Sequence, residues 1–119
     1  MAAPNIVNVA TITGKTVGAA LGTSSADIVT NVGGSGKVFK VNAIYVSNVD
    51  GVNNADVTVG FYDASVTTTF KLANTITVPA DATLDVVSKA IYLEEGDKIT
   101  ALASASGDLE IVVSYEEIS

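Results

Sequence analysis

The sequence contains no cysteine, no histidine and no tryptophan, and all six of its basic residues are lysines, so it has no arginine either. Without cysteine there is no disulfide framework, no thiolate nucleophile and no zinc–thiolate site. Without histidine there is no imidazole general base and no Ser-His triad. Catalysis would have to rest on carboxylates, lysines, tyrosines or hydroxyls. We therefore expect a protein with no catalytic residues and no cofactor.

Positive charge is also scarce, because 13 acidic residues outnumber the 6 lysines and give a formal net charge of −7. The lysines are scattered along the chain, so no basic strip suited to a phosphate backbone is predicted. No apolar run is long enough to span a bilayer. The opening "MAAPNIVNVA" has no basic residue and contains Pro4, unlike a signal peptide. We expect a soluble, unexported domain that binds neither nucleic acid nor membrane.

The residues that are present favour a β protein. Hydrophobic residues make up 48% of the 119 positions and charged residues 16%, which is typical of one globular domain covering residues 1–119. Short β-branched runs alternate with Gly, Asn, Asp and Ser, and no helical period persists for three turns. The expected fold class is an all-β, antiparallel β-sandwich, jelly-roll-like. The expected strands, some of them halves of one bent strand, are 5–13, 15–21, 26–31, 37–48, 55–62, 66–72, 74–79, 82–88, 90–93, 97–103 and 108–115.

Four segments give sharper local predictions. Residues 55–62 and 108–115 alternate apolar and polar positions, which indicates strands with one buried face. The alternation in 37–48 changes phase, and a bulge or corner near Asn42–Ala43, as where a strand passes between two sheets, would reconcile its two halves. A short helix beginning near Ser24, with Asp27 at capping-box spacing, is a minor alternative for that segment.

The stretch "YLEEGDKI" places Glu94, Glu95 and Asp97 close together. We interpret it mainly as an acidic surface turn, in which Gly96 supplies a positive φ. A divalent-cation site and acid catalysis are the weaker alternatives, because nothing nearby in the sequence would raise a carboxyl pKa.

Two further loops carry polar groups. The segment "NVDGVNNAD" (48–56) is predicted to be a hairpin loop, and Asp50, Asn53 and Asp56 are weak candidates for calcium ligands, although the EF-hand spacing is absent. The metal prediction is therefore none. "GGSGK" (33–37) and "TGKT" (13–16) resemble fragments of a phosphate-binding loop, but strand-like segments follow both, and we interpret both as turns.

Tyrosine supplies four of the seven aromatic residues. A stacking platform for carbohydrate is one interpretation, but the absence of tryptophan and the strand positions favour packing at the edge of the core with the hydroxyl in water. These residues are Tyr45, Tyr62, Tyr92 and Tyr115.

Three segments carry a resemblance: "MAAPNIVNVATITGKT", "GKVFKVNAIYVSNVDGVNNADVTVGFYDAS" and "IYLEEGDKITALASASGDLEIVVSYEEIS". Together they resemble small virion structural proteins of tailed phages, especially of the cyanophage type. The resemblance implies a capsid decoration (cement) protein that binds the outer capsid, with the major capsid protein and other virion proteins as partners. It equally admits a tail, neck or fibre component. The implied location is the virion, assembled in the host cytoplasm.

The first residues offer a docking segment. Residues 1–13 are apolar and begin at a free terminus, so they suit either a first core strand or an arm that adds to the sheet edge of a neighbour in a homo-oligomer. The docking candidates are Ile6, Val7, Val9 and Ile12. A calcium-dependent carbohydrate-binding module is the rival from another functional class.

Overall fold

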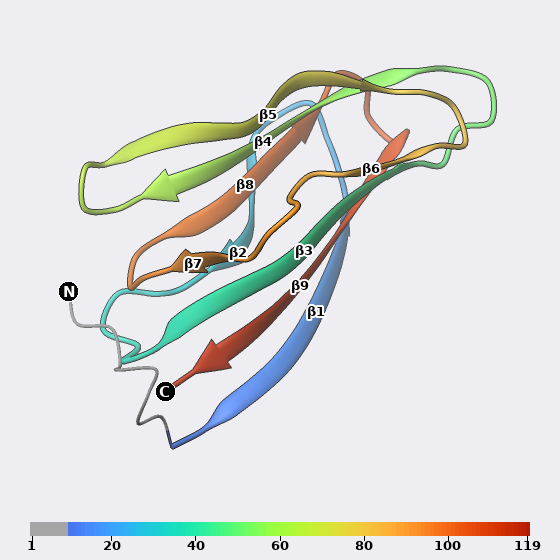
Figure 1. Cartoon of the computed structure of the whole chain (residues 1–119). Helices are drawn as coiled ribbons and strands as arrows, with labels where there is room; N and C mark the ends of the chain where they lie inside the picture. The colour runs from blue at the N-terminus through green and yellow to red at the C-terminus, as the bar shows by residue number, and fades with distance from the viewer. Residues whose placement is uncertain (1–9) are drawn as a thin grey trace.

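In a computed structural model that describes residues 10–119, the chain forms two antiparallel sheets packed face to face (Figure 1). The first sheet contains, in spatial order, β1 (Ile12–Ala20), β9 (Leu109–Ile118), β3 (Val38–Asn48) and β6 (Thr83–Asp85), and β7 (Ile91–Leu93) pairs with the other end of β3. The second contains β2 (Ala26–Thr30), β8 (Lys98–Ala103), β4 (Ala55–Asp63) and β5 (Thr68–Val78). The first strand thus lies beside the last, and the second beside the last but one, which is the jelly-roll order. The expected jelly-roll-like β-sandwich is confirmed.

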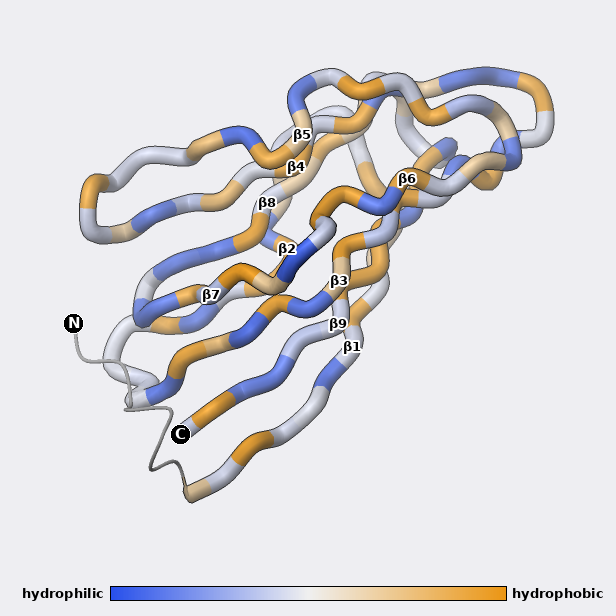
Figure 2. Tube along the Cα trace, viewed as in Figure 1, coloured by the Kyte–Doolittle hydropathy of each residue, from blue (hydrophilic) through white to orange (hydrophobic). Residues whose placement is uncertain are grey.

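The core lies between the sheets and is built by alternation along each strand. Val57 and Val59 of β4 are fully buried, as are Leu109, Ile111 and Val113 of β9. Both strands therefore bury the face that their sequence patterns predict. Figure 2 shows the same alternation as orange and blue segments that follow one another along the long strands.

The phase change in β3 is a bulge. The pairing of β3 with β9 shifts register between Val41 and Ala43, so that Val41 and Ile44 both reach the core. The predicted position is confirmed, but the predicted passage between sheets is wrong. Beyond the bulge β3 continues in the first sheet, because β9 stays paired with it as far as Asn48.

One local expectation differs from the structure, and two pairs of expected strands are halves of one strand, as expected of some. No helix forms at Ser24, which lies in a bend just before strand β2. Within residues 10–119, no helix is long and apolar enough to cross a membrane. The strands expected at 15–21 and in the last part of 5–13 are one strand, β1, because the ladder to β9 continues through Gly14. Likewise 66–72 and 74–79 are halves of one strand, β5.

Most loops connect the two sheets rather than neighbouring strands. The segment 48–56 runs from β3 in the first sheet to β4 in the second, so the predicted hairpin is wrong. The turn at 94–97 connects β7 to β8 in the same way. The consecutive strands β4 and β5 do pair with each other. An alternating pattern identifies a strand but not the strand that it pairs with. The sequence therefore does not distinguish a hairpin loop from a loop that crosses to the other sheet.

Candidate functional site: an open sheet edge

Within residues 10–119, strand β1 lies at the margin of the first sheet and is paired on one side, by β9 (Figure 1). Its nine residues match β9 one for one, from Ile12 opposite Ile118 to Ala20 opposite Glu110, without a register shift. Only Val17 among them is partly buried, and the other eight side chains are exposed. Ile12, the one docking candidate within the described residues, begins this strand and is 57% exposed. Ile6, Val7 and Val9 lie outside the described residues.

The ends of the ladder show which backbone groups face the open side. Thr11 and Ser119 exchange two hydrogen bonds, of 3.0 and 2.9 Å, and the Leu21 amide donates to the Leu109 carbonyl at 2.9 Å. In an antiparallel pair, residues that bond to the partner alternate with residues whose amide and carbonyl point away. Because the register between these two ends is continuous, odd-numbered residues bond to β9. The outward-pointing groups therefore belong to Ile12, Gly14, Thr16, Gly18 and Ala20.

The outer face of the first sheet continues from this edge. Val112 of β9 lies between Gly18 of β1 and Tyr45 of β3 in one cross-strand row. Tyr45 is 43% exposed, and Tyr92, which is opposite Lys40, is 45% exposed. Part-exposed aromatic side chains are typical anchors of a binding surface.

A shallow hollow opens where β1 and β9 meet at the upper end of this edge. Its volume is about 280 Å³, and a Cβ built on Gly18 would have only ordinary contacts, 3.7 Å from the Ile111 carbonyl and 3.8 Å from a Val112 methyl. The missing side chain of Gly18 thus leaves space beside the sheet edge. The lining residues are Gly18, Ala19, Ala20, Glu110, Ile111 and Val112.

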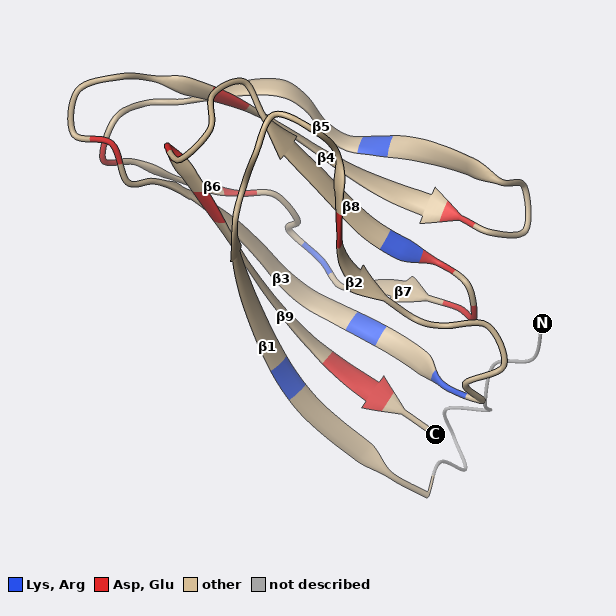
Figure 3. Cartoon of the chain, turned by 180° about the vertical axis from the view of Figure 1, so that it is seen from behind, with Lys and Arg blue, Asp and Glu red and all other residues tan. Residues whose placement is uncertain are grey.

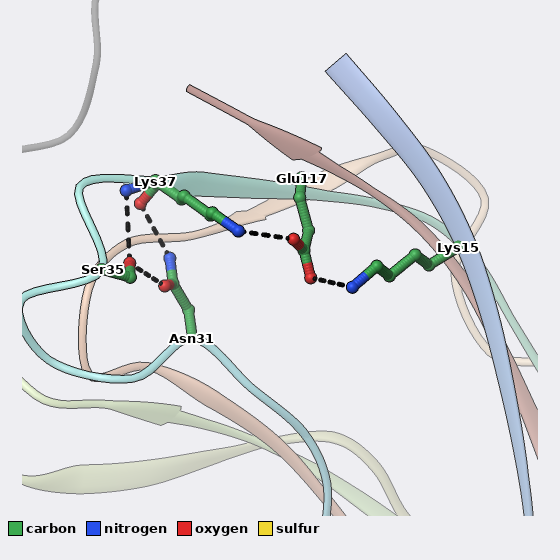
Figure 4. A network of polar contacts seen from close by, with 5 residues as sticks. All are labelled: Lys15, Asn31, Ser35, Lys37 and Glu117. Carbon is green, nitrogen blue, oxygen red and sulfur yellow. Dashed lines mark hydrogen bonds and ion pairs between the residues drawn. The ribbon is translucent and has the colours of Figure 1, made fainter. Parts of the chain in front are cut away.

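At the other end of the edge, Glu117 of β9 forms ion pairs with Lys15 of β1 and with Lys37, which directly precedes β3 (Figure 4). One carboxylate oxygen lies 3.0 Å from the Lys15 ammonium and the other 2.8 Å from the Lys37 ammonium. The hydrogen bond from Lys37, and after it the one from Lys15, lower the pKa of Glu117 below its usual range. In turn, the hydrogen bond to Glu117 raises the pKa of Lys15. Lys15, the sole charged residue of β1, is therefore engaged within its own chain. Figure 3 shows the basic (blue) segment of β1 beside the acidic (red) end of β9.

The glycine-rich loop is anchored from within by Asn31 (Figure 4). This side chain has no exposed surface; its amide donates to the carbonyls of Lys37 and Leu93, at 2.9 and 3.0 Å, and its oxygen accepts from the Ser35 hydroxyl at 2.6 Å. The Gly36 amide donates to the Glu95 carboxylate at 2.8 Å. A loop amide that would face a phosphate is thus bound to a carboxylate. The similar segment "TGKT" lies within β1.

The acidic stretch at 94–97 is a turn, and Gly96 has the expected positive φ, of 91°. The prediction of an acidic surface turn holds for Glu94, which is exposed, but it is wrong for the other two carboxylates, because Glu95 is buried and Asp97 is 3% exposed. Asp97 accepts bonds of 2.9 Å from the amides of Ala64 and Glu94. The carboxylates hold loops together, a role that their sequence neighbours could not reveal.

The weak calcium candidates use their oxygens in hydrogen bonds within the chain. Asp50 accepts from the amides of Val52 and Asn53 and from the Asn53 side chain, at 2.8 to 3.2 Å. Asp56 instead accepts from the Thr77 hydroxyl at 2.7 Å. Within residues 10–119, no three acidic side chains gather in a manner that would hold a metal ion.

Asp50 also affects a second carboxylate at this end of the sandwich. The amide of Val52 and the side chain of Asn53 lower the pKa of Asp50. Burial first, and then the negative charge of Asp50, raise the pKa of Asp108. The negative charge of Asp50 therefore disfavours ionisation of Asp108.

The four tyrosines do not form one platform. Tyr115 is buried and stacks on Phe39, with ring centroids 5.2 Å apart. Tyr62 is half-buried beneath the Lys98 ammonium, which lies 5.2 Å from the ring centroid. Tyr45 and Tyr92 lie on the outer face already described. The prediction of packing at the core edge thus holds for Tyr115 and Tyr62, whereas Tyr45 and Tyr92 are surface residues.

No protein-family model and no curated protein matches this sequence. Among solved structures, a chain from the acid-stable capsid of Helicobacter pylori bacteriophage KHP30 is similar, with a TM-score of 0.56 and 12% identity over 94% of this chain and 90% of that one. A chain from Bacillus endospore appendages, which form disulfide-linked pili, has a TM-score of 0.56 and 17% identity over 92% of this chain and 87% of that one. These similarities show a shared fold. The present chain has no cysteine, so it forms no disulfide links of its own.

Proposed function

We propose that this chain is a non-enzymatic structural protein of a phage virion, which binds the outer capsid and stabilises contacts between capsid subunits. The observation that carries the proposal is the open edge of β1, regular over nine residues and continuous with a face that exposes Tyr45 and Tyr92. Proteins that act alone cover or interrupt such edges, because they add strands from other chains. A protein that works by contact with other subunits benefits from leaving one available.

The fold and the sequence support the same function. The fold is similar to that of a chain from a phage capsid, and three segments of the sequence resemble small virion proteins of tailed phages. Fold similarity alone does not carry function, so the open edge gives the proposal its physical basis. The proposed partners are the major capsid protein and other virion proteins, and the proposed location is the virion, assembled in the host cytoplasm.

The carboxylates support a structural role rather than a chemical one. The carboxylates of Asp97 and Asp50 accept hydrogen bonds from backbone amides of loops. The carboxylate of Glu117 is bound by two lysines. A general acid or base needs a carboxyl that is free to exchange a proton with a substrate. We accordingly propose no catalytic residue and no cofactor.

The test is the copy number of this chain in purified virions, measured by quantitative mass spectrometry against the major capsid protein. Decoration of the capsid predicts a simple ratio to the shell protein. A ratio of a few per cent would contradict decoration and favour a neck, tail or fibre component. Absence from the particle would overturn the virion assignment.

A further inference from the structure

We propose that the open edge of β1 accepts residues 1–9 of a second copy of this chain as an added strand, so that copies join head to tail. The inference deepens the proposed function, on which it rests, by naming the partner of the same edge. Addition of a strand would pair the amides and carbonyls of the even-numbered residues of β1, for example Gly14, Thr16 and Gly18, which point away from β9.

The other sheet margins are interrupted, and β1 is not. The ladder between β2 and β8 shifts between Asp27 and Val29, and that between β4 and β5 shifts twice, with Thr75 of β5 at a φ of 54°. The margin of β3 is covered by the three-residue strands β6 and β7. Bulges and short strands are the devices that keep an edge from pairing with another chain. Among the described strands, β1 is the long edge that lacks them.

The side chains of β1 leave its open groups accessible. The residues whose amides and carbonyls point to the open side are mostly small, and their side chains lie on the outer face of the sheet. These small residues are Gly14, Thr16, Gly18 and Ala20. The charge of Lys15, which is opposite the core residue Tyr115, is bound by Glu117. Beyond the exposed Ile12 at the start of β1, an approaching strand therefore meets neither a bulky outer-face side chain nor an unbalanced charge.

Residues 1–9 match this edge in length and chemistry. They are nine, as are the residues of β1, and at about 3.3 Å per residue an extended segment would cover about 30 Å. They contain no charged side chain. In an added strand Ile6 would face opposite to Val7 and Val9, since side chains alternate. Ile6 would then fill the hollow beside Gly18, and the two valines would lie beside Val17 and Ala19.

The start of the described chain favours a second copy over the chain's own β1. The amides of Ala10 and Thr11 both donate to the Ser119 carbonyl, at 2.8 and 3.0 Å. These bonds hold residues 10 and 11 on the β9 side of β1, opposite to its open edge. To reach its own edge the chain would have to reverse direction within residues 9–12, where both amides are already bound. A neighbouring copy offers the same edge without that reversal.

The experiment uses two full-length variants, each lacking one half of the contact. The double substitution Val7→Asp with Val9→Asp disables the donor, meaning the inserting segment 1–9, because it places charges beside the core. Thr16→Pro disables the acceptor, meaning the receiving edge of β1, because proline lacks the outward amide and leaves the odd-numbered ladder to β9 in place. Thr16→Val, which keeps the amide, is the matched control. Sedimentation velocity gives the size of each protein alone and of the two defective variants mixed in equal amounts.

The wild-type chain and Thr16→Val are expected to form oligomers, and each defective variant to be monomeric. Their mixture is expected to form a species of two chains, because one intact donor meets one intact acceptor. A monomeric wild type, a defective variant that still assembles, or a mixture that stays monomeric would overturn the proposal. Should Thr16→Pro unfold, Gly18→Val replaces it by filling the hollow. A monomeric chain that is abundant in virions would refute only this inference, whereas an oligomeric chain absent from virions would refute only the capsid proposal.

Discussion

Replacing Asn31 by aspartate tests how strongly one buried amide holds the sandwich together. The substitution keeps the shape of the side chain, and it exchanges a group that donates two hydrogen bonds for an oxygen that donates none when ionised. The carbonyls of Lys37 and Leu93 then lose their donor and face a negative charge instead. The Ser35 hydroxyl keeps its acceptor. The change is therefore confined to two bonds, of which the one to Lys37 closes the glycine-rich loop and the one to Leu93 joins that loop to β7.

The magnitude follows from burial. Asn31 has no exposed surface, so water cannot replace the lost donors. Each unsatisfied buried group costs about 1–3 kcal/mol, so the two carbonyls together give a loss of about 2–6 kcal/mol in the free energy of unfolding. For a domain of this size, about 4 °C per kcal/mol corresponds to a fall of roughly 8–24 °C in melting temperature. Burial and the two carbonyls should also raise the pKa of the new carboxyl.

The assay is thermal unfolding of Asn31→Asp and wild type between pH 4 and pH 8, with Asn74→Asp as the same chemical change at an exposed position. A raised folded-state pKa gives stability that is present below the unfolded-state value and is lost as the pH rises through the folded-state value. The deficit of Asn31→Asp should therefore shrink toward acid pH. A deficit within about 2 °C of that of Asn74→Asp, or one independent of pH, would refute the reasoning.

Three further predictions concern single side chains. Glu117 has a lowered pKa, so its stabilisation is present above the ordinary glutamate pKa and lost as the pH falls through the folded-state value. Thermal melts should show Glu117→Gln less stable than wild type at pH 7 and equal to it in strong acid, and an equal deficit at both pH values would contradict the ion-pair interpretation. Asp108 has a raised pKa, so Asp108→Asn should increase the melting temperature at pH 7 by removing repulsion from Asp50, and this gain should vanish in strong acid. A lower melting temperature at pH 7 would refute that prediction. Gly60→Ala should cost about 1–3 kcal/mol in denaturant unfolding, because its Cβ would lie 2.6 and 2.8 Å from two threonine side chains, whereas Gly14→Ala, which meets nothing within 4 Å, should be near neutral.

The strands and their buried faces could be predicted because each pattern is local. Val57 and Val59, or Ile111 and Val113, lie two residues apart, and burial on one face is visible within a window of eight residues. The same holds for the bulge in β3, since a phase change needs only its own flanks. The order of strands is not local. Nothing in 48–56 distinguishes a hairpin from a loop that crosses to the other sheet.

The interior role of the acidic turn could not be predicted for the same reason. The partner of Asp97 is the amide of Ala64, 33 positions earlier, and the partner of Glu95 is Gly36, 59 positions earlier. Only the fold brings them together. The open edge was equally hidden, because its strand alternates weakly. The signal that was present is the spacing of Gly14 and Gly18, which keeps one face of β1 small.

The treatment of its edges connects the stability of this protein to its proposed role. Bulges in the ladders of β2 and β5 and short strands along β3 weaken those margins as templates for pairing. Each bulge or short strand loses backbone hydrogen bonds within the chain. A domain that functions alone would accept this loss at every sheet edge. The chain omits the devices at β1 alone among its long described edges, and there it also keeps side chains small and neutralises Lys15 through Glu117. An edge left open by neglect would not combine a regular ladder, small residues and a balanced charge, whereas an edge that receives another chain requires all three.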